Sequence, residues 1–177
     1  MHSFNYLVPA LFWNFRLGNL STGGVQALGK VKYATLQSEP GFEPAFKGEM
    51  RYGTDYVTIN GASPAARPHL SGTIFPDDGS KPFLMQVNGV QLADPEVDGI
   101  TTNSSGQGRQ VPYGRVYSVW TPTFSGGDPS YTNLQNPIFV ASETVSDGEQ
   151  PGEVLVGLKI SKVFPVKTDV VIGEEFP

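Results

Sequence analysis

Short apolar runs alternate with turn-forming residues along the whole chain. In the run from Glu153 to Val163, the apolar residues Val154, Val156, Leu158 and Ile160 recur at every second position. Successive side chains of a β-strand point to opposite faces, so this alternation predicts a strand with one buried face.

Turn signals separate the runs at short intervals, as at Asp78-Gly79 and Asn60-Gly61, where both residue types tolerate positive φ. No helix longer than a turn or two is predicted. Many short strands joined by turns are typical of an all-β sandwich or barrel. The predicted strands are Ala10 to Leu17, Gly29 to Gln37, Ala45 to Tyr52, Asp55 to Asn60, Pro68 to Phe75, Phe83 to Val90, Gly114 to Trp120, Ile138 to Thr144 and Glu153 to Val163.

The composition agrees with this pattern. The chain has 177 residues, which suits a single domain over 1–177 with a sizeable core. Its 21 Gly and 15 Pro argue against a helical bundle, because both residues break helices. We expect residues 94–110 to form a flexible loop, either a functional lid or a plain surface loop, and residues 165–177 to form a C-terminal tail.

Charge and cysteine content exclude several classes of function. The net charge of −5 would repel a phosphate backbone, so nucleic acid is not expected as a partner. With no cysteine, the chain has no disulfide, thiolate metal site or cysteine nucleophile. No apolar run reaches the roughly 20 residues that span a bilayer, so no membrane span is expected. The apolar N-terminal segment lacks the basic region of a signal peptide, so we expect a cytoplasmic protein, with secretion left open.

Three segments of the chain share a pattern with known proteins: Phe46 to Tyr56, Arg67 to Gly79 and Phe124 to Val140. The first contains Gly-Glu, a Gly turn and an Asp-aromatic pair, and the second is an Arg-containing strand that ends in Asp-Gly. The third contains Phe, Gly-Asp-Pro, Tyr and a final Phe-Val. Together they resemble the family of small bacterial and fungal β-barrel proteins known as domain of unknown function 3237, over most of Leu11 to Val163.

This resemblance implies a closed antiparallel β-barrel of about eight to ten strands, lipocalin-like in general shape. Some members of the family are associated with natural-product biosynthesis, which implies a cyclase or lactonising role. Asn133 stands where the family usually has Trp, and Gln135 stands where it usually has Asn. If these side chains line a pocket, the ligand of this protein differs from the usual one.

Candidate catalytic residues are polar side chains that fall inside predicted strands, because a barrel of about eight strands can hold one small ligand in its mouth. Glu49 and Asp55 flank Gly53. A carboxylate held in an apolar barrel would have a raised pKa and could act as a general acid or base. The alternative is that Glu49 faces water and Asp55 hydrogen-bonds its own turn.

Three further residues are predicted to be catalytic. Arg67 and His69 lie two residues apart, so on one strand they share a face and could bind a carboxylate or enolate. The alternative for His69 is a structural histidine. Tyr131, in the third family segment, could donate its phenol to a carbonyl and stabilise an oxyanion. Asp128 in the same segment is expected to cap a turn.

The predicted substrate-binding residues are Arg115, Tyr117, Trp120, Phe124 and Asn133. Arg115 and Tyr117 share one strand face and Trp120 lies on the other, so either face could look inward. Tyr117 or Trp120 could stack against a flat or polyene-like ligand, or Trp120 could pack in the core. Phe124 and Asn133 belong to the third family segment.

The chain lacks the standard motifs for nucleophilic, nucleotide-binding and metal-dependent catalysis, so no cofactor and no metal are expected. The leading hypothesis is a cofactor-independent enzyme that cyclises, lactonises or isomerises a hydrophobic polyketide- or polyene-like intermediate inside the barrel. A noncatalytic carrier of a small hydrophobic molecule and a structural module are the alternatives. We also expect a homodimer, formed through an exposed strand edge or the apolar N-terminal segment.

Overall fold

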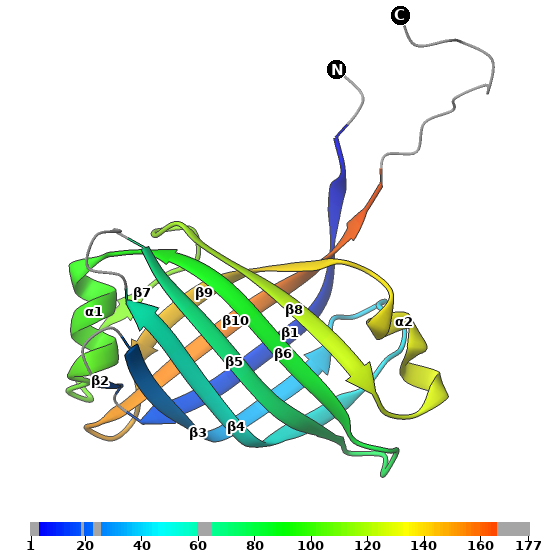
Figure 1. The fold of residues 1–177 in the computed structure, drawn as a ribbon, viewed down its shortest axis with the longest axis horizontal. Coiled ribbons are helices and arrows are strands. Elements are labelled where there is room, and N and C mark those ends of the chain that lie inside the picture. The colour runs from blue at the N-terminus through cyan, green and yellow to red at the C-terminus, as the bar shows by residue number, and fades with distance from the viewer. Residues whose placement is uncertain (1–3, 19, 23–25, 60–64, 166–177) are drawn as a thin grey trace, which may run out of the picture.

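Among the residues that the computed structural model describes, 4–18, 20–22, 26–59 and 65–165, eight long antiparallel strands form a closed ring (Figure 1). Their order is β1-β10-β9-β8-β6-β5-β4-β3, and the pairing of β1 with β3 closes the ring. The prediction of an all-β barrel is therefore confirmed. The eight strands are β1 (Tyr6–Gly18), β3 (Gln26–Ser38), β4 (Lys47–Ile59), β5 (Ala65–Pro76), β6 (Phe83–Leu92), β8 (Ser118–Gly126), β9 (Phe139–Asp147) and β10 (Glu153–Phe164).

Shorter strands and helices lie at the ends of the ring. Two-residue strands pair at its rim, β2 (Ser21–Thr22) with β3 and β7 (Gln110–Val111) with β9. The helix α1 (Pro95–Thr102) lies at one end of the barrel, and α2 (Thr132–Gln135) lies at the opposite end (Figure 1). A 3-10 turn, η1 (Pro129–Tyr131), leads into α2. The two ends of the barrel are therefore closed by different parts of the chain.

Aromatic side chains fill the barrel at the α2 end. The ring of Tyr131 packs against Phe46 and Phe83, with centroids 5.4 and 5.2 Å away. Phe124 makes an edge-to-face contact with Phe139 at 5.5 Å. Because these rings interdigitate as a packed core, they form the floor of the barrel interior.

β4 is one strand, although the sequence pattern predicts two strands separated by a turn at Gly53. Its pairing with β5 shifts register between Arg51 and Thr54, and Tyr52 in this β-bulge has a φ of 59°. Gly53 is needed for close packing, because a Cβ there would lie 2.9 Å from Val31 Cβ. A bulge inserts an extra residue, so it reverses which residues face inward along the rest of the strand.

The predicted flexible loop at 94–110 contains the helix α1. Asp94 caps this helix, because its side chain accepts hydrogen bonds from the backbone N–H groups of Glu96 and Val97 at 2.9 and 3.2 Å. The apolar residues Val97 and Ile100, three positions apart, are buried against the barrel. An Asp-Pro cap followed by this spacing predicts a helix, and the prediction of a loop there is wrong for Pro95–Thr102.

Several strand boundaries differ from the sequence pattern, and those of β8 differ most. The strand predicted from Gly114 begins only at Ser118, because Gly114 adopts a φ of +76° in a turn. The predicted Asn60-Gly61 turn and all of the predicted tail after Pro165 lie outside the described residues. The Asp78-Gly79 turn is confirmed between β5 and β6, with Gly79 at a φ of +79°.

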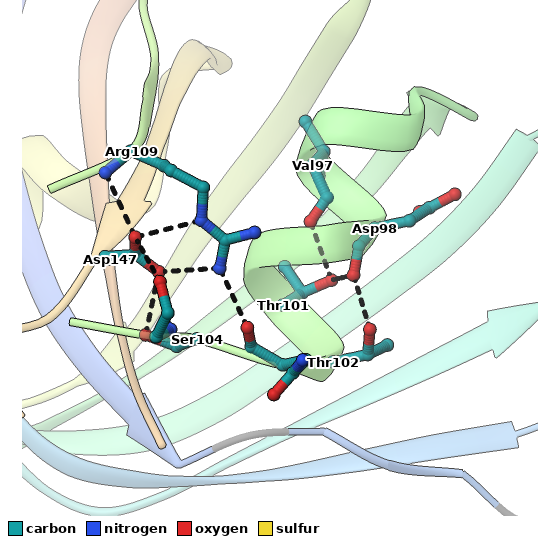
Figure 2. A network of polar contacts seen from close by, with 9 residues as sticks. Val97, Asp98, Thr101, Thr102, Ser104, Arg109 and Asp147 are labelled. Atoms are coloured by element: carbon teal, nitrogen blue, oxygen red, sulfur yellow. Dashed lines mark hydrogen bonds and ion pairs between the residues drawn. The ribbon is translucent and has the colours of Figure 1, made fainter. Parts of the chain in front are cut away.

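An ion pair ties the segment after α1 to the end of β9 (Figure 2). The Nε and Nη2 atoms of Arg109 donate to the two carboxylate oxygens of Asp147, each at 3.0 Å, and Nη2 also donates to the carbonyl of Asn103 at 2.8 Å. Ser104 Oγ donates to the same carboxylate at 3.0 Å. These bonds, those from Arg109 first, hold the pKa of Asp147 well below its ordinary value despite its burial.

Replacing Asp147 with Asn is expected to destabilise the α1 end of the barrel. The variant keeps the shape of the side chain but removes the charge that several donors share, so the free energy of unfolding should fall by about 2–3 kcal/mol. Urea denaturation measures this, and hydrogen exchange should show reduced protection over Pro95–Thr102. Glu149→Gln breaks an exposed pair with Arg16 and should change the free energy by no more than about 0.5 kcal/mol. Equal effects of the two variants would contradict the structural role of Asp147.

Candidate active site

A cavity of about 340 Å³ lies inside the barrel at the α1 end. Apolar side chains from several strands form most of its wall, among them Phe15, Leu17, Val57 and Val156. The last turn of α1 contributes Thr101 and Thr102, and the Thr101 carbonyl accepts a hydrogen bond of 3.0 Å from the backbone of Leu20. The helix is thus fixed over a cavity of the size that holds a small organic molecule.

Asp55 brings a carboxylate into this apolar wall from β4. Its side chain lines the cavity, the residue is only 4% exposed, and Oδ1 has no hydrogen-bond partner among the described residues. The pKa of Asp55 is raised to about 7, first by burial and then by the negative charge of Glu143, while His69 opposes the shift. A carboxyl group with this pKa exchanges its proton readily at neutral pH.

Glu143 brings a second carboxylate from the opposite wall. It lies on β9, and the strand order β4-β5-β6-β8-β9 places β9 halfway around the eight-stranded ring from β4. On β9, Phe139, Ala141 and Val145 point into the core, so Glu143, which has the same parity, points inward too. The two carboxylates therefore face one cavity from two sides.

A chain of hydrogen bonds holds the Glu143 carboxylate in place. Gln91 Nε2 donates to Glu143 Oε2 at 2.8 Å, and Ser118 Oγ donates to the same oxygen. Trp120 Nε1 in turn donates to Ser118 Oγ at 2.9 Å. Burial raises the pKa of Glu143, while these hydrogen bonds, that of Ser118 foremost, act to lower it. The bonds fix one oxygen of Glu143, and Oε1 receives none of them.

A third acidic side chain reaches the cavity from α1. Asp98 lines it together with Thr101 and Thr102. Burial raises the pKa of Asp98, and the negative charge of Asp94 adds to the shift. Of the described residues that line the cavity, none is Lys, Arg or His.

Among the predicted site residues, the structure places Asp55 and Trp120 at the cavity and Glu49 on the outer surface. The Glu49 side chain is 41% exposed and forms an ion pair with Arg51 at 3.6 Å. Glu49 and Asp55 would share a face in an unbroken strand. The bulge at Tyr52 puts them on opposite faces. Glu49 therefore faces water, which is the alternative stated for it, and Asp55 faces the interior.

Arg67 and His69 do share a face of β5, as predicted, but it is the outer face. Together with Tyr117 they line a shallow groove on the outside of the barrel, and His69 Nδ1 lies 2.7 Å from Asn88 Oδ1. Tyr117 is 61% exposed. The structure therefore does not bring Arg67 and His69 together with the carboxylates, and the predicted grouping with Asp55 is not formed.

The remaining predicted residues also lie outside the cavity. Tyr131 and Phe124 are buried in the aromatic floor at the other end, where the Tyr131 hydroxyl donates to Asp78 Oδ2 at 3.3 Å. Burial raises the pKa of Tyr131. Asn133 is exposed on α2, and Arg115 pairs with Glu96 on the surface at 3.0 Å. The third family segment thus closes the α2 end of the barrel, where Asp128 caps η1 as predicted.

Sequence reasoning missed Glu143, Gln91, Ser118 and Asp98. Alternation gave no clear signal for Glu143, because apolar residues occupy both phases of the predicted strand from Ile138. Asp98 was not considered, because it lies in the segment predicted to be a loop and the candidates were taken from predicted strands. In the described ranges, no group of three or more His, Asp or Glu is arranged to hold a metal ion. No helix in that part of the chain is long and apolar enough to cross a membrane.

The fold and cavity define a class of protein: a closed antiparallel β-barrel with a small-molecule-sized cavity at one end. The chain belongs to the family described as "Protein of unknown function (DUF3237)", which it matches over residues 7–163. The resemblance found in the sequence is therefore confirmed. No functionally curated protein matches the chain.

Solved structures share the fold. A conserved protein of unknown function from Rhodopseudomonas palustris has a TM-score of 0.70 at 17% identity, covering 91% of this chain and 99% of that one. A protein of unknown function from Clostridium acetobutylicum has a TM-score of 0.65 at 18% identity, covering 91% and 100%. A β-barrel-like protein from Acinetobacter baumannii has a TM-score of 0.58 at 16% identity, covering 91% and 97%. At these identities the likeness shows the fold alone.

Replacing Asp55 with Asn is expected to stabilise the protein above neutral pH. Between about pH 4 and 7 the folded protein keeps a proton on Asp55 that the unfolded chain releases, so stability falls as the pH rises through this window. The amide of the variant cannot ionise and escapes this loss. At about 1.4 kcal/mol per pKa unit, the variant should be more stable than the parent by roughly 2–4 kcal/mol at pH 8 and equal to it near pH 4.

Urea denaturation at a series of pH values measures this difference. Glu49→Gln, on the outer surface of the same strand, should leave the pH dependence as it is in the parent protein. An Asp55→Asn variant that is less stable than the parent at pH 8 would show that Asp55 is held by a cationic partner, against the environment described above.

Proposed function

We propose that this protein is a cofactor-independent enzyme that uses acid–base chemistry on a small hydrophobic molecule of polyketide or polyene type. The observation that carries the proposal is the buried carboxyl group of Asp55, which lines an apolar cavity opposite Glu143 and has one oxygen without a hydrogen-bond partner among the described residues. Leaving such a group unpaired destabilises the fold, and groups of this kind concentrate at functional sites.

The two carboxyl groups suit a reaction that moves a proton within the substrate. The carboxylate of one removes a proton from one carbon, and the carboxylic acid of the other donates a proton elsewhere, so no net proton or electron is consumed. Isomerisation and cyclisation fit this balance because they need proton transfer and a shaped site. Closure of a lactone from a hydroxy acid fits it too: the base removes the proton of the attacking hydroxyl, and the acid donates a proton to the carboxyl OH, which leaves as water. Asp55, with a pKa of about 7, is available in both protonation states at neutral pH.

The walls of the cavity support an apolar substrate. Phe15, Leu17, Val57 and Val156 exclude water from the carboxylates, and a medium of low polarity strengthens the electrostatic effects that stabilise a transition state. Trp120 offers an aromatic ring within the same wall, which matches the predicted stacking role for a flat or polyene-like ligand.

A carrier is the second candidate function, and the mostly apolar wall favours it. In that case Asp55 and Glu143 would recognise a polar end of the ligand, and the ligand would leave the barrel unchanged. The experiment below distinguishes the two functions by the fate of the bound molecule.

The predicted homodimer stays a prediction, and one surface supports it. Beyond the barrel, the first residues of β1 and the last of β10 continue as a two-stranded ribbon (Figure 1). Leu7 is 56% exposed there, and Tyr6 stacks on Phe164 at 5.4 Å while remaining 43% exposed. A second copy that covers this ribbon would remove its apolar surface from water.

The proposed enzyme should convert a hydrophobic compound only when both carboxylates are intact. The purified protein is incubated in D₂O with a small-molecule extract of its source, and the products are followed by liquid chromatography and mass spectrometry. We expect one compound to be replaced either by an isomer with deuterium at the carbon that receives a proton, or by its lactone, lighter by one water and without added deuterium on carbon. Asp55→Asn or Glu143→Gln should lower kcat by about 10²- to 10⁴-fold, the usual contribution of a general acid or base.

Glu49→Gln is the matched control, because it removes an acidic residue of β4 that faces solvent, and it should turn over as the parent does. A compound that is bound and released unchanged by the parent would identify a carrier. Equal turnover by the parent and the Asp55→Asn variant would overturn the assignment of the site.

A further inference from the structure

The charge of the cavity points to a narrower class of ligand. We propose that the cavity binds an apolar molecule that carries a positive charge, such as a protonated amine, and rejects an anion of the same shape. This inference deepens the proposed function, since it concerns the same cavity, but it concerns binding and holds equally for an enzyme or a carrier.

The charged groups that line the cavity are all acidic among the described residues. Asp55, Asp98 and Glu143 approach it from β4, α1 and β9, and no Lys, Arg or His is found among its described lining residues. An enclosed site lined by one sign of charge attracts ligands of the opposite sign. A carboxylate or phosphate placed there would meet the charge of an ionised buried carboxylate in surroundings of low polarity, which is unfavourable, and Asp98 adds a like charge at the exposed rim.

The buried carboxyl group of Asp55 also favours a cationic ligand. The residue is 4% exposed, and its Oδ1 has no hydrogen-bond partner in the described parts of the chain. Buried carboxylates are normally paired or hydrogen-bonded, and the Asp55 carboxyl group, which helps to line the cavity, lacks this compensation at its buried Oδ1. An ammonium group carries the donors and the charge that this oxygen lacks.

The nearby cations of the protein are engaged elsewhere or lie on the other side of the wall. Arg109 is bound to Asp147, and Arg115 pairs with Glu96 on the surface. Arg67 and His69 face the outer groove. The charge of His69 lowers the pKa of Asp55 from the other side of the barrel wall, without contact in the cavity. These described side chains therefore leave the ionised carboxylates of the cavity available to a cationic ligand.

Trp120 adds a second recognition element for a cation. Its indole ring forms part of the cavity wall, and its Nε1 is committed to Ser118. An aromatic face attracts a cation through the electrons of its ring, most strongly where water is excluded. The same features would stabilise positive charge that develops on a substrate after protonation, so the binding preference agrees with acid-initiated isomerisation or cyclisation.

Three probes of one shape and different charge test this proposal: 1-adamantylmethylamine, 1-adamantylmethanol and 1-adamantanecarboxylate. Each has a rigid apolar cage that fits a cavity of about 340 Å³, and binding is measured by titration calorimetry at pH 7.5. The amine should bind at least about tenfold more tightly than the alcohol, as expected for one charge-assisted hydrogen bond. The carboxylate should bind at least about tenfold more weakly than the alcohol.

The double variant Asp55→Asn, Glu143→Gln should bind the amine and the alcohol with equal affinity, and its unchanged affinity for the alcohol shows that the cavity is intact. Glu49→Gln should keep the preference of the parent protein. The proposal is overturned if the carboxylate binds as well as the amine, if the preference survives in the double variant, or if the parent binds no amine at about 1 mM.

The outcome is separable from that of the proposed function. A preference for the amine without any turnover in the D₂O experiment would support the charge selectivity and leave a carrier. Turnover that depends on Asp55, without a preference for the amine, would support the proposed enzymatic function and exclude a cationic ligand.

Discussion

Closure of the sheet is the constraint on which the rest of the structure depends. Because β1 pairs with both β3 and β10, the eight-stranded ring has no free edge, and each strand has one face inside and one outside. Inward-pointing side chains must then either fill the barrel interior or leave a cavity in it. Aromatic rings around Tyr131 pack it at the α2 end, whereas smaller and aliphatic side chains leave a cavity under α1.

The hollow end combines features that are unfavourable for stability and useful for chemistry. Two carboxyl groups from opposite walls, Asp55 and Glu143, are desolvated there, which raises the pKa of both, and the charge of Glu143 adds to the shift of Asp55. The free-energy cost of burying these carboxyl groups is offset by the backbone hydrogen bonds of the closed sheet and by the aromatic packing at the α2 end. The ion pair of Arg109 with Asp147 holds the segment after α1 in place, so the cover of the cavity is part of the fold.

The third family segment lies at the opposite end of the barrel from the candidate site, whereas the first family segment contains the site residue Asp55. The segment from Phe124 to Val140 supplies Tyr131, which is buried in the floor, and Asp128, which caps η1. Its hydrogen-bonding side chains are explained by turn formation and packing. The pattern therefore identified the family and the fold correctly, while the cavity residue Glu143 lies just beyond it.

The sequence by itself determined the strands, most of their turns and the class of fold, because alternation and turn chemistry are local properties. It also determined that Asp55 lies in a strand with Val57 on the same face. Only the tertiary structure decided that this face looks inward and Glu49 outward, because the bulge at Tyr52 reverses the alternation. The meeting of Asp55 with Glu143 follows from ring closure and strand register, which depend on pairing between distant segments and cannot be read from either strand alone.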